Sequence, residues 1–240
     1  MTASQDPYPI RVNAVLDPPL SRWRWLVKWL LVIPHYVVLA FLWAGFLVCT
    51  VVAFFAILFT ERYPRSLFDF NLSVLRWTWR VHYYAYGALG TDRYPPFSLG
   101  EHPDYPAHLD IPYPQRLSRR LVLIKWWLLA LPHYLVLSIL VGGGLWAGQR
   151  AHDALGISGL LGLLVCIAAI SLLFRGTYPD SLYRLIMGVN RWSLRVTAYA
   201  ALMTDAYPPF RLDQGGADPD SRTVPSGPSP IPLLPEPAAG

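Results

Sequence analysis

Two pairs of arginines are the residues in this chain whose type and spacing best suit a binding site. Within each pair the residues lie four positions apart, so both guanidinium groups fall on one face of a helix. Such a face can hold a phosphate or carboxylate by paired hydrogen bonds. The pairs are Arg76 with Arg80 and Arg191 with Arg195. We expect them to bind an anion or lipid headgroup, or else only to seat their helix by reaching headgroups or by pairing with Asp92 and Asp205.

Two histidines form the second candidate site, because each follows a proline inside an apolar segment. Pro34 precedes His35, and Pro132 precedes His133. Proline lacks an amide hydrogen, so each segment should kink and leave a carbonyl in need of a new partner. Each histidine is therefore either a polar site within the membrane, able to carry a proton, or an ordinary packed side chain.

Groupings typical of catalysis or metal binding are missing from the sequence. There is no glycine-rich phosphate loop, no paired-histidine ligand spacing and no Gly-x-Ser-x-Gly elbow. Cys49 and Cys166 each lie alone in an apolar run, as small buried residues do. We expect no metal, no cofactor and no enzymatic activity. A lipid-directed enzyme with Asp92 or His35 as base is a minor alternative.

The composition indicates an integral membrane protein. Hydrophobic residues make up 54% of the chain and charged residues 15%, whereas about a quarter of a soluble domain is charged. Three long stretches carry no charge: 29–60, 126–149 and 154–174. Each has the roughly 20 residues that span a bilayer. Basic residues flank these stretches, so the net charge of +5 predicts contact with membrane lipids and not with nucleic acid. A set of buried helices in a soluble core is the alternative.

The chain is an internal repeat, with four blocks recurring in the same order. Each module contains a Pro-His-Tyr block, a Tyr-Pro block, an arginine-rich block and a Thr-Asp-x-Tyr-Pro-Pro-Phe block. In the first module these begin at Pro34, Tyr63, Arg76 and Thr91, and in the second at Pro132, Tyr178, Arg191 and Thr204. We divide the chain into membrane module 1 (1–100), membrane module 2 (101–212) and a disordered Pro-rich tail (213–240).

The combined blocks resemble a bacterial membrane-protein family known only as a domain of unknown function, numbered 4389. The resemblance covers residues 8–99 and 105–212, in two tandem copies. It implies a helical membrane module and brings no activity, cofactor or partner.

Two topologies are open for the first module. It is either a tight hairpin turning near Ala44-Gly45 or one long tilted helix that crosses once. Basic residues on both sides of each apolar region favour a hairpin in each module, with both chain termini in the cytoplasm. A single crossing in module 1 would instead invert module 2, as in some transporters. In the second module we expect helices over 119–147 and 155–174, with a polar break at 149–153.

An amphipathic helix should follow each hairpin. In the segment 65–86 a polar stripe contains Arg76 and Arg80, and tryptophans and tyrosines crowd the other positions, as in helices that lie at a membrane interface. Asp92 and Asp205 belong to the diproline blocks, which we interpret as structural closing turns. The predicted fold is all-α: two tandem helical-hairpin modules, each followed by an interfacial helix.

These features favour a multi-pass protein of the cell membrane, either a non-catalytic scaffold or an accessory subunit. It would contact lipid headgroups, a membrane-protein partner or another copy of itself. The alternative is a small transporter or channel with its path between the two modules.

Overall fold

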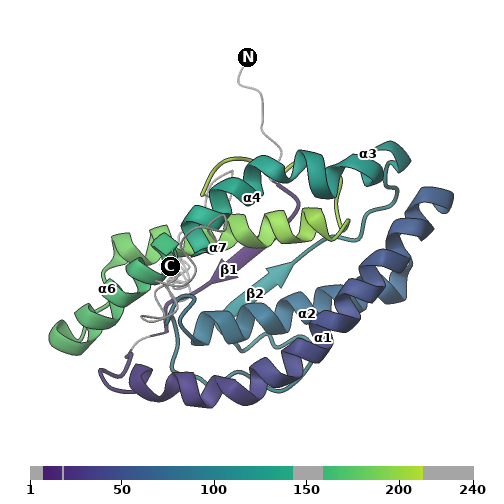
Figure 1. Cartoon of the computed structure of the whole chain (residues 1–240). Helices are drawn as coiled ribbons and strands as arrows, with labels where there is room; N and C mark the ends of the chain where they lie inside the picture. The colour runs from purple at the N-terminus through teal and green to yellow at the C-terminus, as the bar shows by residue number, and fades with distance from the viewer. Residues whose placement is uncertain (1–7, 18, 143–158, 213–240) are drawn as a thin grey trace, which may run out of the picture.

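The computed structural model describes residues 8–17, 19–142 and 159–212, and it is mostly helical with one small sheet (Figure 1). The elements of the first half are β1 (Arg11–Ala14), α1 (Trp25–Thr60) and α2 (Arg65–Tyr84). Those of the second half are β2 (Ala107–Asp110), α3 (Arg119–Ile124), the π-helical turn η1 (Lys125–Leu129), α4 (Leu131–Leu137), the π-helical turn η2 (Ser138–Gly142), α6 (Gly159–Arg175) and α7 (Asp180–Ala200). The all-α expectation is therefore correct only for the bulk of the chain.

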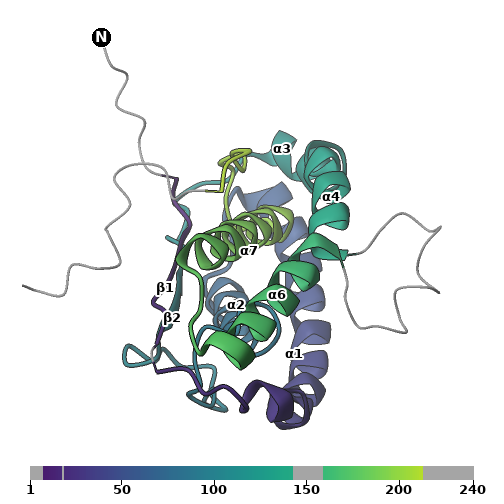
Figure 2. The ribbon, with the colours of Figure 1, turned by 90° about the vertical axis from the view of Figure 1, so that its left-hand side faces the viewer.

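The elements form three layers. In Figure 2 the two-stranded sheet lies on one side, α2 and α7 lie in the middle, and α1 lies on the other side together with α4 and α6. The middle helix α2 packs on α1 and also on β2, while α7 packs on α6 and β1. The long apolar helices thus make up one face of the molecule and the sheet the opposite one.

Helix α1 runs without interruption through Ala44-Gly45, so the hairpin expected in module 1 is wrong. Its 36 residues have a length of about 54 Å at 1.5 Å per residue. Gly45 does not form a turn; a β-carbon there would lie 3.2 Å from the Phe70 ring, so the glycine allows α2 to approach closely. The basic residues on the two sides of the apolar run mark the two ends of one helix.

Module 2 contains the same long helix in broken form. Figure 1 shows α6 continuing the line of α3 and α4, and α6 packs against η2. Gly142 and Gly159 meet at the break, since a β-carbon on Gly159 would lie 2.5 Å from the Gly142 amide nitrogen. Both have positive φ, which glycine permits. The hairpin expected in module 2 is therefore wrong as well.

The buried positions confirm that α6 corresponds to the second half of α1. Phe46, Ala53 and Ile57 are buried in α1, and residues 115 positions later are buried in α6. These are Leu161, Ala168 and Leu172. The expected polar break at 149–153 lies outside the described residues, as does the tail 213–240.

The two modules exchange their opening strands. β1 pairs antiparallel with β2, and Val12 lies opposite Leu109. Arg76 Nε of α2 donates to the Leu109 carbonyl at 2.9 Å, and Arg191 Nε of α7 donates to the Val12 carbonyl at 3.2 Å. Each strand thus packs on the other module's helix, in a two-fold arrangement. The division at residue 100 follows the repeat, whereas the packing crosses it.

The helices α2 and α7 are not at the periphery, in contrast to the interfacial position expected for them. Trp77 and Trp79 of α2 are 5% and 1% exposed, because α1 covers one side of the helix and β2 the other. Of the arginines on their polar stripes, Arg80 and Arg195 are buried, whereas Arg76 and Arg191 are half-buried.

Candidate functional site

A buried ion pair joins the start of α1 to the closing turn of module 1. Lys28 Nζ lies 3.0 Å from Asp92 Oδ1, and their side chains are 2% and 13% exposed. The same ammonium donates to the Thr91 carbonyl at 2.7 Å and lies 4.7 Å from the centre of the Tyr84 ring. Asp92 Oδ2 accepts from the Ser21 amide at 2.6 Å. Both charges are therefore compensated inside the protein, as burial requires.

The same closing turn also encloses His35, which lies seven residues after Lys28 on α1. The Phe97 ring stacks on the imidazole with centroids 3.8 Å apart, and Trp77 Nε1 donates to His35 Nδ1 at 3.1 Å. A nitrogen that accepts this bond carries no proton, so the neutral ring has its hydrogen on Nε2. His35 is fully buried, and its Nε2 has no hydrogen-bond partner within the described part of the chain.

Module 2 repeats this arrangement. Lys125 Nζ lies 2.8 Å from Asp205 Oδ1, and Ser118 donates its amide to Asp205 Oδ2 at 2.6 Å. Trp192 Nε1 donates to His133 Nδ1 at 3.2 Å, and Phe210 stacks on that imidazole at 4.2 Å. We call each set a closing cage. The first comprises Lys28, His35, Trp77, Asp92 and Phe97, and the second comprises Lys125, His133, Trp192, Asp205 and Phe210.

A π-helical turn keeps the two cages equivalent despite different spacing. Lys28 precedes His35 by seven residues, whereas Lys125 precedes His133 by eight. In η1 the Ala130 amide donates to the Lys125 carbonyl at 2.9 Å, a bond five residues long that accommodates one extra residue. Lys125 therefore reaches Asp205 although the sequence blocks align Lys28 with Trp126.

The arginine pairs do not meet the closing-turn carboxylates, so the expected pairing with Asp92 and Asp205 is wrong. Those carboxylates instead form ion pairs with Lys28 and Lys125. Arg80 is 3% exposed and donates to the backbone carbonyls of Gly100, at 2.8 Å, and Ser98. Arg195 is fully buried, and its guanidinium lies 5.3 Å from the centre of the Tyr8 ring.

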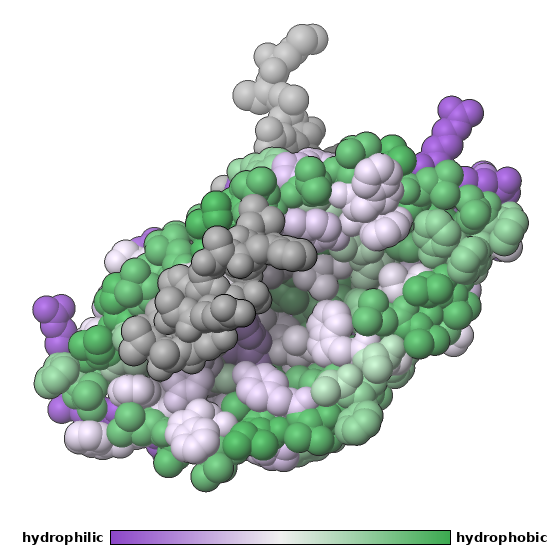
Figure 3. Space-filling view, viewed as in Figure 1, coloured by the Kyte–Doolittle hydropathy of each residue, from purple (hydrophilic) through white to green (hydrophobic). Residues whose placement is uncertain are grey.

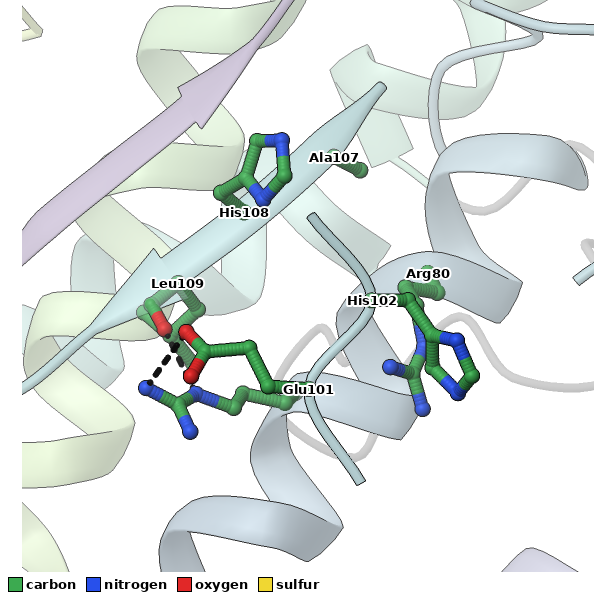
Figure 4. A pocket seen from close by; sticks show the side chains of 7 residues that line it. Arg80, Glu101, His102, Ala107, His108 and Leu109 are labelled. Carbon is green, nitrogen blue, oxygen red and sulfur yellow. Dashed lines mark hydrogen bonds and ion pairs between the residues drawn. The ribbon is translucent and has the colours of Figure 1, made fainter. Parts of the chain in front are cut away.

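A small polar cavity of about 20 Å³ lies where Arg76 and Arg80 approach the sheet. Figure 4 shows Arg80 beside the His102 ring and the Glu101 side chain near Leu109 of β2. The lining residues are Arg76, Arg80, Glu101, His102, Ala107, His108 and Leu109. Arg76 Nη2 lies 3.3 Å from Glu101 Oε1 and 3.7 Å from Asp110 Oδ1. These carboxylates offset its charge, and the volume suits about one water molecule.

Burial also changes the acidity of groups around the cages. It raises the pKa of Tyr199 to about 12, with smaller contributions from Tyr207 and Asp205. Burial likewise raises the pKa of Tyr84 and lowers that of Arg80. The tyrosines next to the lysines are therefore neutral phenols, and the carboxylates hold the lysine charge. The arrangement is suited to joining helix and turn.

The third feature of the site is an exposed apolar face. Two helices are long and apolar enough to cross a membrane, Trp25–Thr60 and Arg119–Gly142. Figure 3 views this face. Apolar side chains (green) lie along both long helices, and hydrophilic side chains (purple) project at the two ends. Large side chains such as Phe41 at 75%, Val48 at 64% and Ile139 at 64% are exposed on it.

Sequence reasoning missed the lysines, the tryptophans and the phenylalanines of the cages. Trp77 and Phe97 lie in repeated blocks, so their recurrence could have singled them out. Lys125 could not be found by the same signal, because it lies one position out of register with Lys28. None of the described residues form a group of three or more His, Cys, Asp or Glu that could hold a metal ion.

Comparison with known proteins identifies one family. Its model, described as a domain of unknown function (DUF4389), matches residues 22–98 and 156–211. The first matched segment contains the whole first closing cage. The second contains Trp192, Asp205 and Phe210 of the second cage, but not Lys125 or His133. No curated protein and no solved structure matches the chain.

Proposed function

Because the chain belongs to the DUF4389 family, a domain of unknown function present here in two copies, we propose its role from the structure: it is a non-catalytic membrane scaffold. Its apolar face contacts lipid, and its closing cages hold the two long helices in register. The opposite face, formed by the sheet, is free to meet a partner or a second copy.

The observation that carries this proposal is the extent of the apolar face. Exposed large residues continue from Leu26 to Phe59 along α1 and from Leu123 to Phe174 along the described part of the broken helix. Soluble monomers rarely expose contiguous apolar patches above a few hundred Å². Each Å² of apolar surface removed from water contributes about 25 cal/mol, so lipid contact would stabilise this face strongly.

Headgroup contacts come from the ends of the long helices. The exposed basic side chains there are Arg22, Arg24, Arg62, Arg116, Arg119, Arg120 and Arg175. They flank aromatic residues such as Trp23, which is 65% exposed, and this combination is typical of membrane interfaces. Arg80 and Arg195 are less suited to lipid than the sequence implied, because both side chains are buried.

The alternative, a small transporter, draws support from the two-fold arrangement of the modules, in which the long helices run in opposite directions. The enclosure of His35 and of His133 by a phenylalanine and a tryptophan argues against a path through these side chains. A reconstituted protein should therefore move no ions or solutes. Flux in liposomes that disappears in His35→Phe or His133→Phe, with flotation retained, would favour the transporter.

Flotation with liposomes of neutral and anionic lipids tests the scaffold's membrane contact. The test variant carries Phe41→Glu, Val48→Glu and Phe55→Glu, which lie on the exposed side of α1. The matched control adds three glutamates at exposed positions on or next to the strands, as Val15→Glu, Pro103→Glu and His108→Glu. We expect the control to float and the test variant, with its helical circular dichroism unchanged, to lose at least tenfold of its bound fraction. Equal flotation of both, or of neither, contradicts the proposal.

A further inference from the structure

We propose that the protein binds the membrane from one side, with α1 and the broken helix α3–α6 lying in the plane of the membrane and the sheet in water. This inference rests on the membrane contact proposed above and specifies its geometry. The lipid contact is then a single leaflet, and neither long helix crosses the bilayer.

The sheet lies behind the centre of α1 and not beyond either of its ends. Trp43, near the middle of α1, donates from Nε1 to Thr78 Oγ1 of α2 at 3.2 Å. Two residues before Thr78, Arg76 donates to Leu109 of β2. A line from the middle of the long helix through α2 therefore reaches the sheet, as the layers in Figure 2 show.

A crossing orientation would place this sheet at the centre of the bilayer. Glu101 and Asp110 beside Arg76 have side chains that are 65% and 68% exposed, so lipid tails would surround ionised carboxylates. Ionisable side chains inside a bilayer are costly and almost always face a protein interior or a water-filled cavity, whereas these two side chains face outward.

An in-plane orientation removes this conflict. Packed layers are separated by roughly 10 Å, so the sheet would lie about 20 Å from the axis of α1, in water. Exposed apolar side chains would enter the leaflet, as those of in-plane amphipathic helices do to a depth of about 5–10 Å. The arginines at both helix ends would then lie at the same headgroup level.

Charge distinguishes a lipid leaflet from a second copy of the chain as the occupant of this face. Arg24 and Arg175 lie at one end of the face, and Arg62 and Arg120 lie at the other. If the apolar faces of two copies met, arginines of one copy would lie against arginines of the other. This holds whether the two α1 helices run parallel or antiparallel. Anionic headgroups instead complement both ends at once, so the leaflet is the partner that fits.

Labelling with a membrane-impermeant maleimide on sealed vesicles of uniform orientation tests the geometry. In a chain lacking native thiols (Cys49→Ala, Cys166→Ala), single cysteines replace Ser66 near the end of α1, Thr177 near its start, or His108 on the sheet. Gly176, next to Thr177, lies against Arg22, which fixes this position at the opposite end of α1 from Ser66. A Val48→Cys variant serves as the lipid-facing control.

We expect Ser66→Cys, Thr177→Cys and His108→Cys to react to the same extent from one side, either all before or all after permeabilisation. Val48→Cys should react at least tenfold more slowly until detergent is added. Reaction of Ser66→Cys and Thr177→Cys from opposite sides would overturn the inference and leave the membrane scaffold intact. Failure of the thiol-free chain to float with liposomes would instead remove the scaffold proposal itself.

Discussion

Lys125 forms a 2.8 Å ion pair with Asp205 from a π-helical turn, and this turn compensates for the extra residue in its half of the repeat. The lysine in module 1 reaches its aspartate from a helix with no such turn. The repeat therefore preserves the position of a charge in space and not its position in the sequence.

Deletion of Leu128 should be tolerated for this reason. It shortens the separation of Lys125 and His133 from eight residues to the seven found in module 1, so η1 can become ordinary α-helix. We expect the free energy of unfolding in detergent to change by less than about 1 kcal/mol. The matched deletion of Leu31 in module 1 should cost far more, because it turns Lys28 about 100° away from Asp92. Equal losses for the two deletions contradict the π-turn account.

Removal of one member of a buried ion pair should destabilise the fold. Lys28→Met leaves the Asp92 carboxylate without its cation, and breaking a buried pair costs roughly 3–5 kcal/mol. Asp69→Asn is the control, because the Arg65–Asp69 pair is exposed and such pairs contribute about 0–1 kcal/mol. Thermal unfolding in detergent measures both. A loss below about 1 kcal/mol for Lys28→Met would show that the cage does not hold α1.

Acidification should destabilise the protein through His82 of α2. Burial lowers the pKa of His82 below its ordinary 6.5, although the Asn190 side chain opposes the shift. As the pH falls below 6.5, the unfolded chain takes up a proton that the folded chain resists, so stability is present above 6.5 and decreases below it. The contribution of His82 to this decrease is at most about 1.4 kcal/mol per pH unit. Unfolding curves from pH 7.5 to 5 should be flatter for His82→Gln; equal slopes contradict the assignment.

Separated modules should need each other to fold. A chain cut between Pro103 and Asp104 leaves β1 in one fragment and its partner β2 in the other. It also separates Tyr83 from Tyr183, whose hydroxyl oxygens lie 2.8 Å apart. We expect co-expressed fragments to purify together and each fragment alone to aggregate or be degraded. A fragment that remains folded and monodisperse alone would contradict the strand exchange.

The sequence predicted the two copies of the family module and the long apolar stretches, because each leaves a local signal. The apolar run of α1 and the repeated Thr-Asp-x-Tyr-Pro-Pro-Phe block are visible without any knowledge of packing. The continuity of α1 could not be predicted, since Ala44-Gly45 is equally compatible with a turn and with a close contact. Only the contact with Phe70 in the folded protein distinguishes the two.

Long-range pairing limited what could be predicted about the candidate site. An arginine pair on one helix face suits an anion and a backbone carbonyl equally well, and the carbonyls of Ser98 and Gly100 come from a segment with no distinctive residue pattern. The strands β1 and β2 are four residues each and 96 positions apart at their starts. Strands this short, paired across the repeat, leave no periodic signal in the sequence.

The most direct test of one-sided membrane contact is a depth profile along α1. Nitroxide labels at Val37, Val48, Phe55 and Phe59, each on an exposed position of this helix, can be compared for their collisions with oxygen and with a water-soluble nickel complex. The in-plane orientation predicts immersion to one similar depth at all four positions. A profile that is deepest at Val48 and reaches water towards the helix ends, or four labels fully accessible to nickel, would contradict it.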